Sequence, residues 1–206
     1  MRALFYPSYF PNIWSAAAMV QADELLFEKF GTYQKQTYRN RTLIYGANGI
    51  QLLTIPVNYS QKNRKMFSEV KISKDYAWQQ NHWKSLQSAY NTSAFFEFYK
   101  DEFEKFYSVE YDKIIDLCIA SIALVFNCLG HELNWSWTTN FDSVSSDKDV
   151  RKLIMPAVED LPQHESYFQL FSTKHGFQSN LSTLDLIFNE GPNALPFLLR
   201  QKIDLI

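Results

Sequence analysis

The sequence predicts an α/β fold with an N-terminal βαβ unit, a β-hairpin and a helical C-terminal half. A strand, a polar turn, a helix and a second strand follow one another within residues 2–30, which is the pattern of a βαβ unit. Two apolar arms then flank an Asn-Gly turn, and helical periodicity dominates from residue 75 onward. Because the chain has 206 residues, of which 46% are hydrophobic, we expect one globular domain over residues 1–206.

The βαβ unit is predicted from three short segments. Residues 2–6 are an apolar strand, residues 13–22 a helix that Asn12 can cap, and residues 24–30 a second strand. Such units favour a parallel sheet, and ligands bind beyond the carboxyl ends of its strands. In this chain those ends are residues 7–12 and 28–35.

The hairpin is predicted over residues 42–45 and 50–55, because Asn48-Gly49 suits the positive φ of a tight turn. A polar loop follows, and we expect one more strand within residues 66–73.

The C-terminal half is predicted to be mainly helical. Helices are expected over residues 75–90, 97–107 and 111–129, and the third is apolar almost all round and therefore central. Gly130 is its natural C-terminal stop. The remaining elements are a strand at 132–141, a linker at 142–149, a short strand at 167–171, a helix opened by Ser182 and a last helix at 194–202.

Charge and composition exclude several classes of protein. The net charge of −2 offers no bulk attraction for nucleic acid, and the longest apolar run is shorter than the roughly 20 residues of a membrane-spanning helix. Cys118 and Cys128 fall in one predicted helix, about 15 Å apart, which is too far for a disulfide. We expect two buried thiols in a cytoplasmic protein.

A cationic run leads into the hairpin and is the first candidate site. Lys35, Arg39 and Arg41 share parity, so in an extended segment they point to one side, with Asn40 between them. Guanidinium and ammonium groups suit a phosphate or carboxylate. The alternative is a solvated loop, or pairing with the acidic residues Glu28 and Asp23.

A second candidate is the helical turn with His82, Trp83 and Lys84. It joins a titratable imidazole, an aromatic ring and a cation, so His82 is a candidate general base or phosphate ligand. The alternative is a surface helix with Trp83 packed inward. The spacing of the other histidines predicts no metal site, and we expect no cofactor.

Other motifs carry little chemistry. Capping accounts for Ser182 and Asp185, which have the spacing of a capping box. Phosphate-loop, dinucleotide-binding and nucleophile-elbow patterns are absent from the sequence.

Several segments together resemble the WbqC-like protein family. They begin with YPSYFP at 6–11, Ala22-Asp23, YQKQTYRNR at 33–41 and LTIPV at 53–57. His82-Trp83-Lys84, Phe95-Phe96-Glu97 and LSTLDLIFNEGP at 181–192 extend the resemblance over nearly the whole chain. Longer members carry a glycine-rich segment before the last motif, and residues 142–164 here have none.

The resemblance implies a role in bacterial surface-polysaccharide biosynthesis, including O-antigen and lipopolysaccharide. It implies a transferase that moves an acyl or aminoacyl group to a nucleotide-linked amino sugar. In that reading Lys35, Arg39, Asn40 and Arg41 hold the anionic substrate, with Trp83 and Lys84 nearby, and Tyr9 and His82 serve the chemistry. The alternative is a non-catalytic binding or accessory protein of envelope assembly, and a homodimer is compatible with either.

The first βαβ unit is also similar to the nucleotidylyl-transferase type of α/β fold, a Rossmann-like layered sandwich. Members of that type use histidines in the first turn to bind nucleotide phosphates. Here Ser8, Tyr9 and Pro11 occupy that turn, so the likeness concerns the fold alone.

Overall fold

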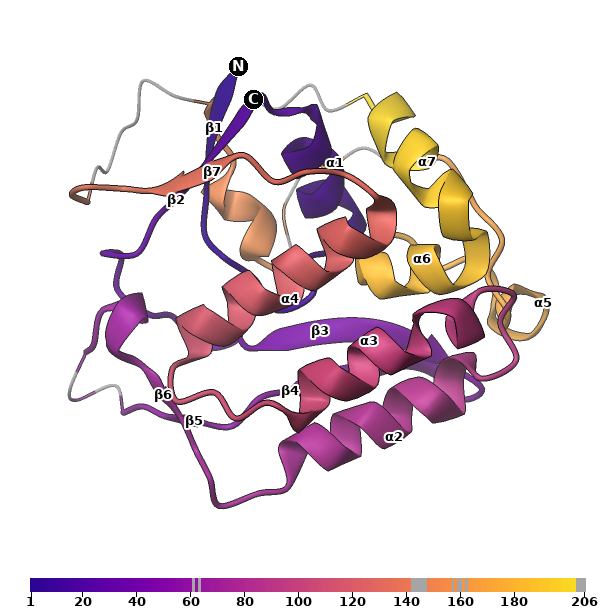
Figure 1. The fold of residues 1–206 in the computed structure, drawn as a ribbon, viewed down its shortest axis with the longest axis horizontal. Coiled ribbons are helices and arrows are strands. Elements are labelled where there is room, and N and C mark those ends of the chain that lie inside the picture. Colours follow the sequence, from indigo (N-terminus) through magenta and orange to yellow (C-terminus); the bar gives the residue numbers. More distant parts are fainter. Residues whose placement is uncertain are drawn as a thin grey trace.

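A parallel sheet of four strands lies at one end of the molecule, in the upper left part of Figure 1. The computed structural model describes residues 1–60, 62, 64–141, 148–156, 158, 161 and 163–202. The strand order is β7-β2-β1-β8, where β1 is Arg2–Phe5, β2 Glu24–Phe27, β7 Trp135–Trp137 and β8 Lys148–Asp149. The predicted α/β class is confirmed.

The N-terminal βαβ unit forms as predicted. Strands β1 and β2 pair in parallel from Arg2–Glu24 to Phe5–Phe27, and helix α1 (Ile13–Gln21) connects them. The side chain of Asn12 caps this helix by accepting a hydrogen bond of 2.8 Å from the Ser15 amide. Both strands therefore end on the same rung, so the residues after them share one edge of the sheet.

The hairpin forms a sheet of its own. Strands β3 (Arg41–Gly46) and β4 (Gly49–Thr54) pair antiparallel around a turn in which Gly49 has a φ of +99°. A second small sheet pairs β5 (Val57–Asn58) with β6 (Lys71–Ile72). Of the strand predicted over residues 66–73, only β6 exists, because Phe67–Glu69 form a 3-10 turn instead.

Helices make up most of the C-terminal half, as predicted. They are α2 (Trp78–Tyr90), α3 (Phe96–Ser108), α4 (Ile114–Leu129), α5 (Ser172–His175), α6 (Thr183–Glu190) and α7 (Ala194–Arg200). Two further 3-10 turns cover Arg151–Ile154 and Gly191–Asn193. Figure 1 shows α2 and α3 side by side next to the hairpin, with α4 between them and the parallel sheet. Gly130 ends α4 in the left-handed region with φ of +65°, as expected.

Four expectations need correction. The linker predicted at 142–149 falls partly outside the described residues. Its last two residues form β8, which pairs in parallel with β1, and the Val150 amide just after β8 donates to Leu4 O. The strand predicted at 167–171 is irregular, because its polar side chains turn inward to a buried carboxylate. The strand predicted at 132–141 shortens to β7. Cys118 is buried in α4, but Cys128 is only half-buried.

No helix within the described ranges is both long and apolar enough to cross a bilayer. In those same ranges no three His, Cys, Asp or Glu side chains come together in a way that could hold a metal ion.

Candidate functional site

The candidate site lies at the carboxyl edge of β1 and β2. Tyr6 and Glu28 are the first residues past the two paired strands, and the Glu28 amide donates to Phe5 O at 2.8 Å. The cationic segment meets the same edge, because the Tyr9 amide donates to Tyr38 O at 2.9 Å. Ligands of parallel sheets bind at such an edge, where strand ends leave main-chain groups and turn side chains open to them.

Arg39 is the central side chain of this edge. Only 1% of it is exposed, and its guanidinium lies 3.9 Å from the ring centre of Tyr6 and 5.1 Å from that of Phe67. Nη1 donates to Thr32 O at 2.9 Å, while Nε has no hydrogen-bond partner among the described residues. Burial lowers the pKa of Arg39, and the neighbouring tyrosines Tyr6 and Tyr33 oppose that shift.

Unpartnered polar atoms gather in the same part of the chain. Within the described residues, the buried side-chain atoms without a hydrogen bond are Ser8 Oγ, Glu28 Oε2, Tyr33 OH, Arg39 Nε, Asn40 Oδ1, Arg41 Nε and Asn189 Oδ1. All but the last belong to the segments that follow β1 and β2 or to Arg41, the first residue of β3. Buried polar groups are normally satisfied, so this concentration indicates a place where another molecule supplies the partners.

Arg41 adds to the positive field of Arg39 near Tyr33. Arg41 is half-buried at the start of β3, and both arginines act to lower the pKa of Tyr33, which burial raises overall. The amide of Asn40 donates through Nδ2 to Ile55 O at 2.9 Å, and its buried side-chain oxygen has no hydrogen bond to a described residue.

Glu28 brings a buried carboxylate to the same carboxyl edge. It is 0% exposed, and its Oε1 accepts from the Phe30 amide and from Thr138 Oγ1 at 3.2 Å. Arg151 lies 5.8 Å from the Tyr6 ring centre, and Glu28 contributes to the rise in the Arg151 pKa, after the hydrogen bond to Asp149 as main cause. The Tyr6 ring therefore has two guanidinium groups near it, those of Arg39 at 3.9 Å and Arg151 at 5.8 Å from its centre.

Lys35 does not join the arginines. Residues 34–40 form turns, with Gln36 at a φ of +66°, so the parity expected of an extended segment does not hold. Lys35 is exposed and lies 5.5 Å over the Tyr59 ring, on the outside of the cluster, whereas Arg39 points inward. The predicted pairing of the cationic run with Asp23 is also absent from the described residues, since Asp23 pairs with the N-terminal ammonium.

Tyr9 and His82, both predicted from sequence to serve the chemistry, contact one another. The Tyr9 hydroxyl lies 3.0 Å from His82 Nδ1 and 2.6 Å from the Tyr107 hydroxyl. Burial lowers the pKa of His82 to about 4, and a hydrogen bond with the Thr54 main chain offsets part of this shift. His82 is thus neutral near pH 7, with both ring nitrogens engaged, which makes the triad a closed hydrogen-bond network.

Trp83 and Lys84 stand apart from the carboxyl edge. Trp83 is half-buried against the rings of Phe96 and Tyr107, whose centres lie 5.9 and 6.1 Å away. Lys84 is exposed on α2. The buried face of this helix includes His82 itself, so the alternative of a surface turn with only Trp83 inward describes it incompletely.

A second buried carboxylate, Asp185, has a complete set of partners. It accepts from Tyr90 OH at 3.0 Å, Tyr167 OH at 2.8 Å and Gln169 Nε2 at 3.0 Å, and its burial raises the pKa to about 6. The capping interpretation holds for Ser182, which accepts from the Leu184 amide, but not for Asp185. Asp185 connects α2, α6 and the irregular segment before α5, which is a structural role.

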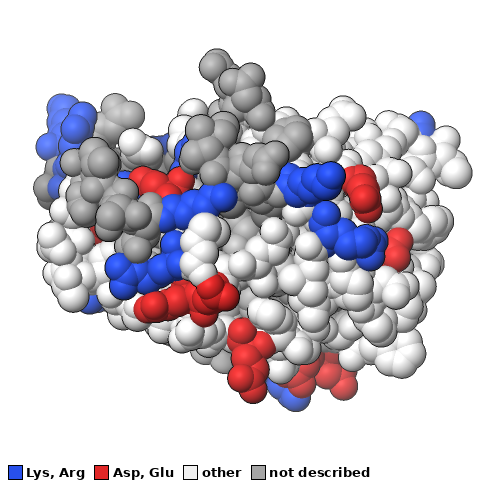
Figure 2. All heavy atoms as spheres, turned by 90° about the horizontal axis from the view of Figure 1, so that it is seen from above, with Lys and Arg blue, Asp and Glu red and all other residues white. Residues whose placement is uncertain are grey.

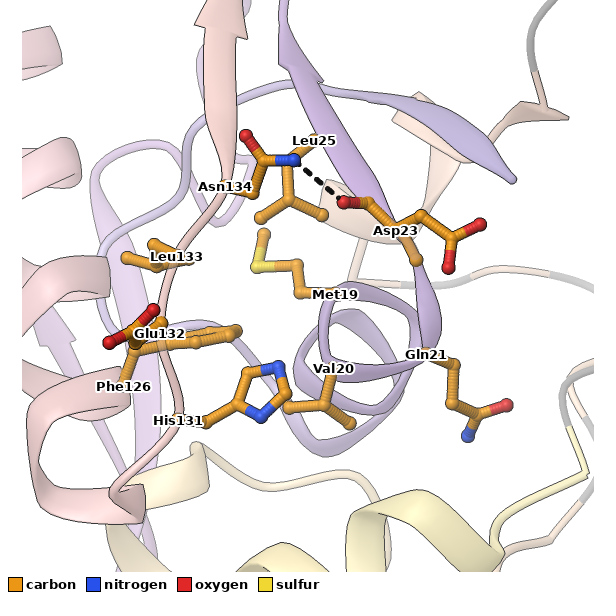
Figure 3. Close-up of a pocket in the computed structure, with 11 residues that line it drawn as sticks. Met19, Val20, Gln21, Asp23, Leu25, Phe126, His131, Glu132, Leu133 and Asn134 are labelled. Atoms are coloured by element: carbon orange, nitrogen blue, oxygen red, sulfur yellow. Dashed lines mark hydrogen bonds between the residues drawn. The ribbon is translucent and has the colours of Figure 1, made fainter.

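A hollow of about 280 Å³ lies at the opposite edge of the sheet, near the start of β2 (Figure 3). Its floor is apolar, with Met19, Val20 and Phe126, and Figure 3 shows Asn134 donating to the main chain of Asp23 at its rim. On the face seen in Figure 2, basic and acidic side chains lie interspersed. Among the described residues, the charged side chains with unpartnered buried atoms are Glu28, Arg39 and Arg41, all at or near the carboxyl edge.

The sequence reasoning missed Tyr6 and Arg151, and treated Glu28 only as a partner for the cations. Tyr6 and Glu28 were within reach, because they lie at the carboxyl ends of the two predicted strands, next to the edge where ligands were expected. Arg151 and Tyr107 carry no sequence signal, since only the fold brings Arg151 beside Tyr6 and Tyr107 beside Tyr9, both distant in the chain.

Comparison with known proteins identifies one relationship. The model of the WbqC-like protein family matches residues 6–161, which include Tyr6, Glu28, Arg39 and Arg41. Neither a curated protein nor a solved structure matches the chain.

Proposed function

The chain belongs to the WbqC-like protein family, and on that premise we propose that the carboxyl edge of its sheet binds the anionic group of a small molecule. The observation that carries the proposal is Arg39, a guanidinium that is 1% exposed and has no carboxylate within salt-bridge distance among the described residues. A phosphate or carboxylate of the ligand is the partner that this geometry favours.

The free-energy balance of the buried Arg39 charge favours binding of an anion. Placing Arg39 over the Tyr6 ring stabilises the charge by about 2 kcal/mol as a desolvated cation–π pair. Desolvating an ion costs several kcal/mol, so the rings offset only part of that cost. An anion that accepts from the free Arg39 Nε and from Arg41 supplies the rest, and Tyr33, on which both arginines act electrostatically, has an unpartnered hydroxyl.

The finer role is transfer of an acyl or aminoacyl group to a nucleotide-linked amino sugar in surface-polysaccharide biosynthesis. The support is family membership together with an anion-friendly strand edge of the kind that holds nucleotide phosphates in other α/β proteins. In this role Arg39 and Arg41 hold the phosphates and Asn40 hydrogen-bonds to the substrate.

A non-catalytic binding or accessory protein of envelope assembly is the second candidate. The closed Tyr9–His82–Tyr107 network favours it, because both nitrogens of the expected base are already engaged and its pKa is about 4. A base with so low a pKa removes protons weakly near pH 7. Turnover of a nucleotide-linked amino sugar with an acyl donor separates the two candidates.

Isothermal titration with pyrophosphate tests the anion site. Wild-type protein should bind it, and Arg41→Gln should weaken binding at least tenfold, the value of one charge-assisted hydrogen bond. Arg39→Lys should also weaken it, because an ammonium cannot form the same fork. Arg200→Gln, which removes an exposed arginine on α7, is the matched control and should bind normally. Equal affinity for pyrophosphate in all four proteins would contradict the proposal.

A further inference from the structure

Glu28 presents a buried carboxylate oxygen that nothing in the described part of the chain uses. Its Oε1 is held by two donors, the Phe30 amide and the Thr138 hydroxyl, which orient the carboxylate. Its Oε2 is buried and has no hydrogen bond to any described residue. A buried acceptor without a hydrogen bond lowers the stability of the fold. A donor group of a ligand would remove that cost, and the fixed orientation of the carboxylate favours such a bond.

The protein does not use Glu28 to neutralise the cationic cluster. No ion pair joins Glu28 to Arg39 or Arg41 among the described residues. Arg151, whose pKa Glu28 helps to raise, donates from Nε to Asp149 Oδ1 at 2.9 Å. The edge therefore offers two separate features, a cationic cluster and an unused acceptor.

We infer that Glu28 is a specificity-determining residue, whose Oε2 accepts a hydrogen bond from an N–H or O–H group of the ligand that Arg39 and Arg41 hold. The inference rests on the proposed anion site. It narrows the ligand to a molecule with an anionic group and, a few bonds away, an ammonium or hydroxyl donor. Plain inorganic anions and simple alkyl phosphates satisfy only the arginines.

Three series of short phosphate monoesters test this. They are ω-aminoalkyl, ω-hydroxyalkyl and unsubstituted alkyl phosphates with two, three and four carbons, titrated into wild type and Glu28→Gln. Glutamine keeps the shape and the Oε1 acceptor but replaces Oε2 with a donor. Glu24→Gln is the matched control, because Glu24 begins the same strand at the opposite edge and already bonds Ser136.

We expect wild type to bind at least one donor-bearing ester tenfold or more tightly than the alkyl ester of equal length. Glu28→Gln should abolish that preference, while its affinity for alkyl phosphate stays equal or rises because a nearby negative charge is gone. Whether the amine or the hydroxyl series shows the preference identifies the donor. Glu24→Gln should behave as wild type.

Two results overturn the inference in distinguishable ways. If alkyl phosphates and pyrophosphate bind but no donor-bearing ester gains affinity, or the gain survives in Glu28→Gln, Glu28 does not contact the ligand and the anion site stands. If neither pyrophosphate nor any ester binds wild type, the anion site itself is wrong and the inference falls with it.

Discussion

The guanidinium of Arg39 lies 3.9 Å from the ring centre of Tyr6, and this contact connects the cationic turn to the end of β1. The two residues are far apart in sequence but share the carboxyl edge of the parallel sheet. Because Arg39 is buried, the ring replaces water on one face of its charge, and the contact determines where the guanidinium sits.

Two substitutions of Tyr6 should therefore separate the contribution of its ring to stability from that of its hydroxyl. Tyr6→Phe keeps the aromatic face and should cost less than about 1 kcal/mol of unfolding free energy. Tyr6→Leu removes the cation–π contact and should cost about 2 kcal/mol more. Urea unfolding measures both, and equal losses in the two variants would show that Arg39 does not depend on the ring.

Gly31 should not tolerate a side chain. A Cβ at this position would overlap the Tyr6 hydroxyl and crowd its ring. Gly31→Ala should lower stability by roughly 1–3 kcal/mol, as overpacking does, and weaken pyrophosphate binding by displacing Tyr6 from Arg39. Gly46→Ala is the control, because its Cβ would meet nothing closer than 3.9 Å. Similar melting temperatures for the two variants would contradict the prediction.

Asp185 should make the protein less stable as pH rises. Burial raises its pKa from 3.8 to about 6, so the folded state binds a proton more readily than the unfolded state between these values. This contribution is fully present below pH 3.8 and is lost as pH rises through 6, a change of roughly 3 kcal/mol.

Asp185→Asn removes that titration. The unfolding free energy of wild type minus that of Asp185→Asn should fall by roughly 3 kcal/mol between pH 4 and pH 7. Asp116→Asn, at an exposed position in the first turn of α4, is the control for replacing an aspartate outside the buried network. If the difference between wild type and Asp185→Asn does not change with pH, the three hydrogen bonds to Asp185 hold its carboxylate ionised.

His82 should act in the opposite direction. Its pKa falls from 6.5 to about 4 on folding, so its contribution is present above pH 6.5 and is lost as pH falls toward 4, by roughly 3 kcal/mol. His82→Gln removes this loss on acidification, which chemical denaturation at pH 7, 5.5 and 4 can follow. An unchanged acid dependence in His82→Gln would show that the imidazole does not stay neutral inside the fold.

The Tyr9–His82–Tyr107 network should be cooperative. Tyr9→Phe and Tyr107→Phe each remove one hydroxyl from a shared set of hydrogen bonds of 3.0 and 2.6 Å. Once one hydroxyl is gone the other has lost its partner, so the double variant should cost less than the sum of the singles by about 1 kcal/mol. Strict additivity in a double-mutant cycle would contradict a connected network.

The sequence by itself determined the elements with strong local signals. The βαβ unit, the Asn-Gly hairpin, the Asn12 cap and the Gly130 stop depend on contacts within a few residues, so periodicity and turn chemistry predict them. The edge where Arg39 and Arg41 would matter followed from the same reasoning, since parallel strands end together.

Only the tertiary structure decided which charges are buried and what they face. Lys35 and Arg39 are similar cations four residues apart, yet turns place one outside on Tyr59 and the other inside on Tyr6. Asp185 has the spacing of a cap but meets Tyr90 and Tyr167 instead. Burial and long-range partners set the energies of such groups, and both arise from packing between segments that are distant in the chain.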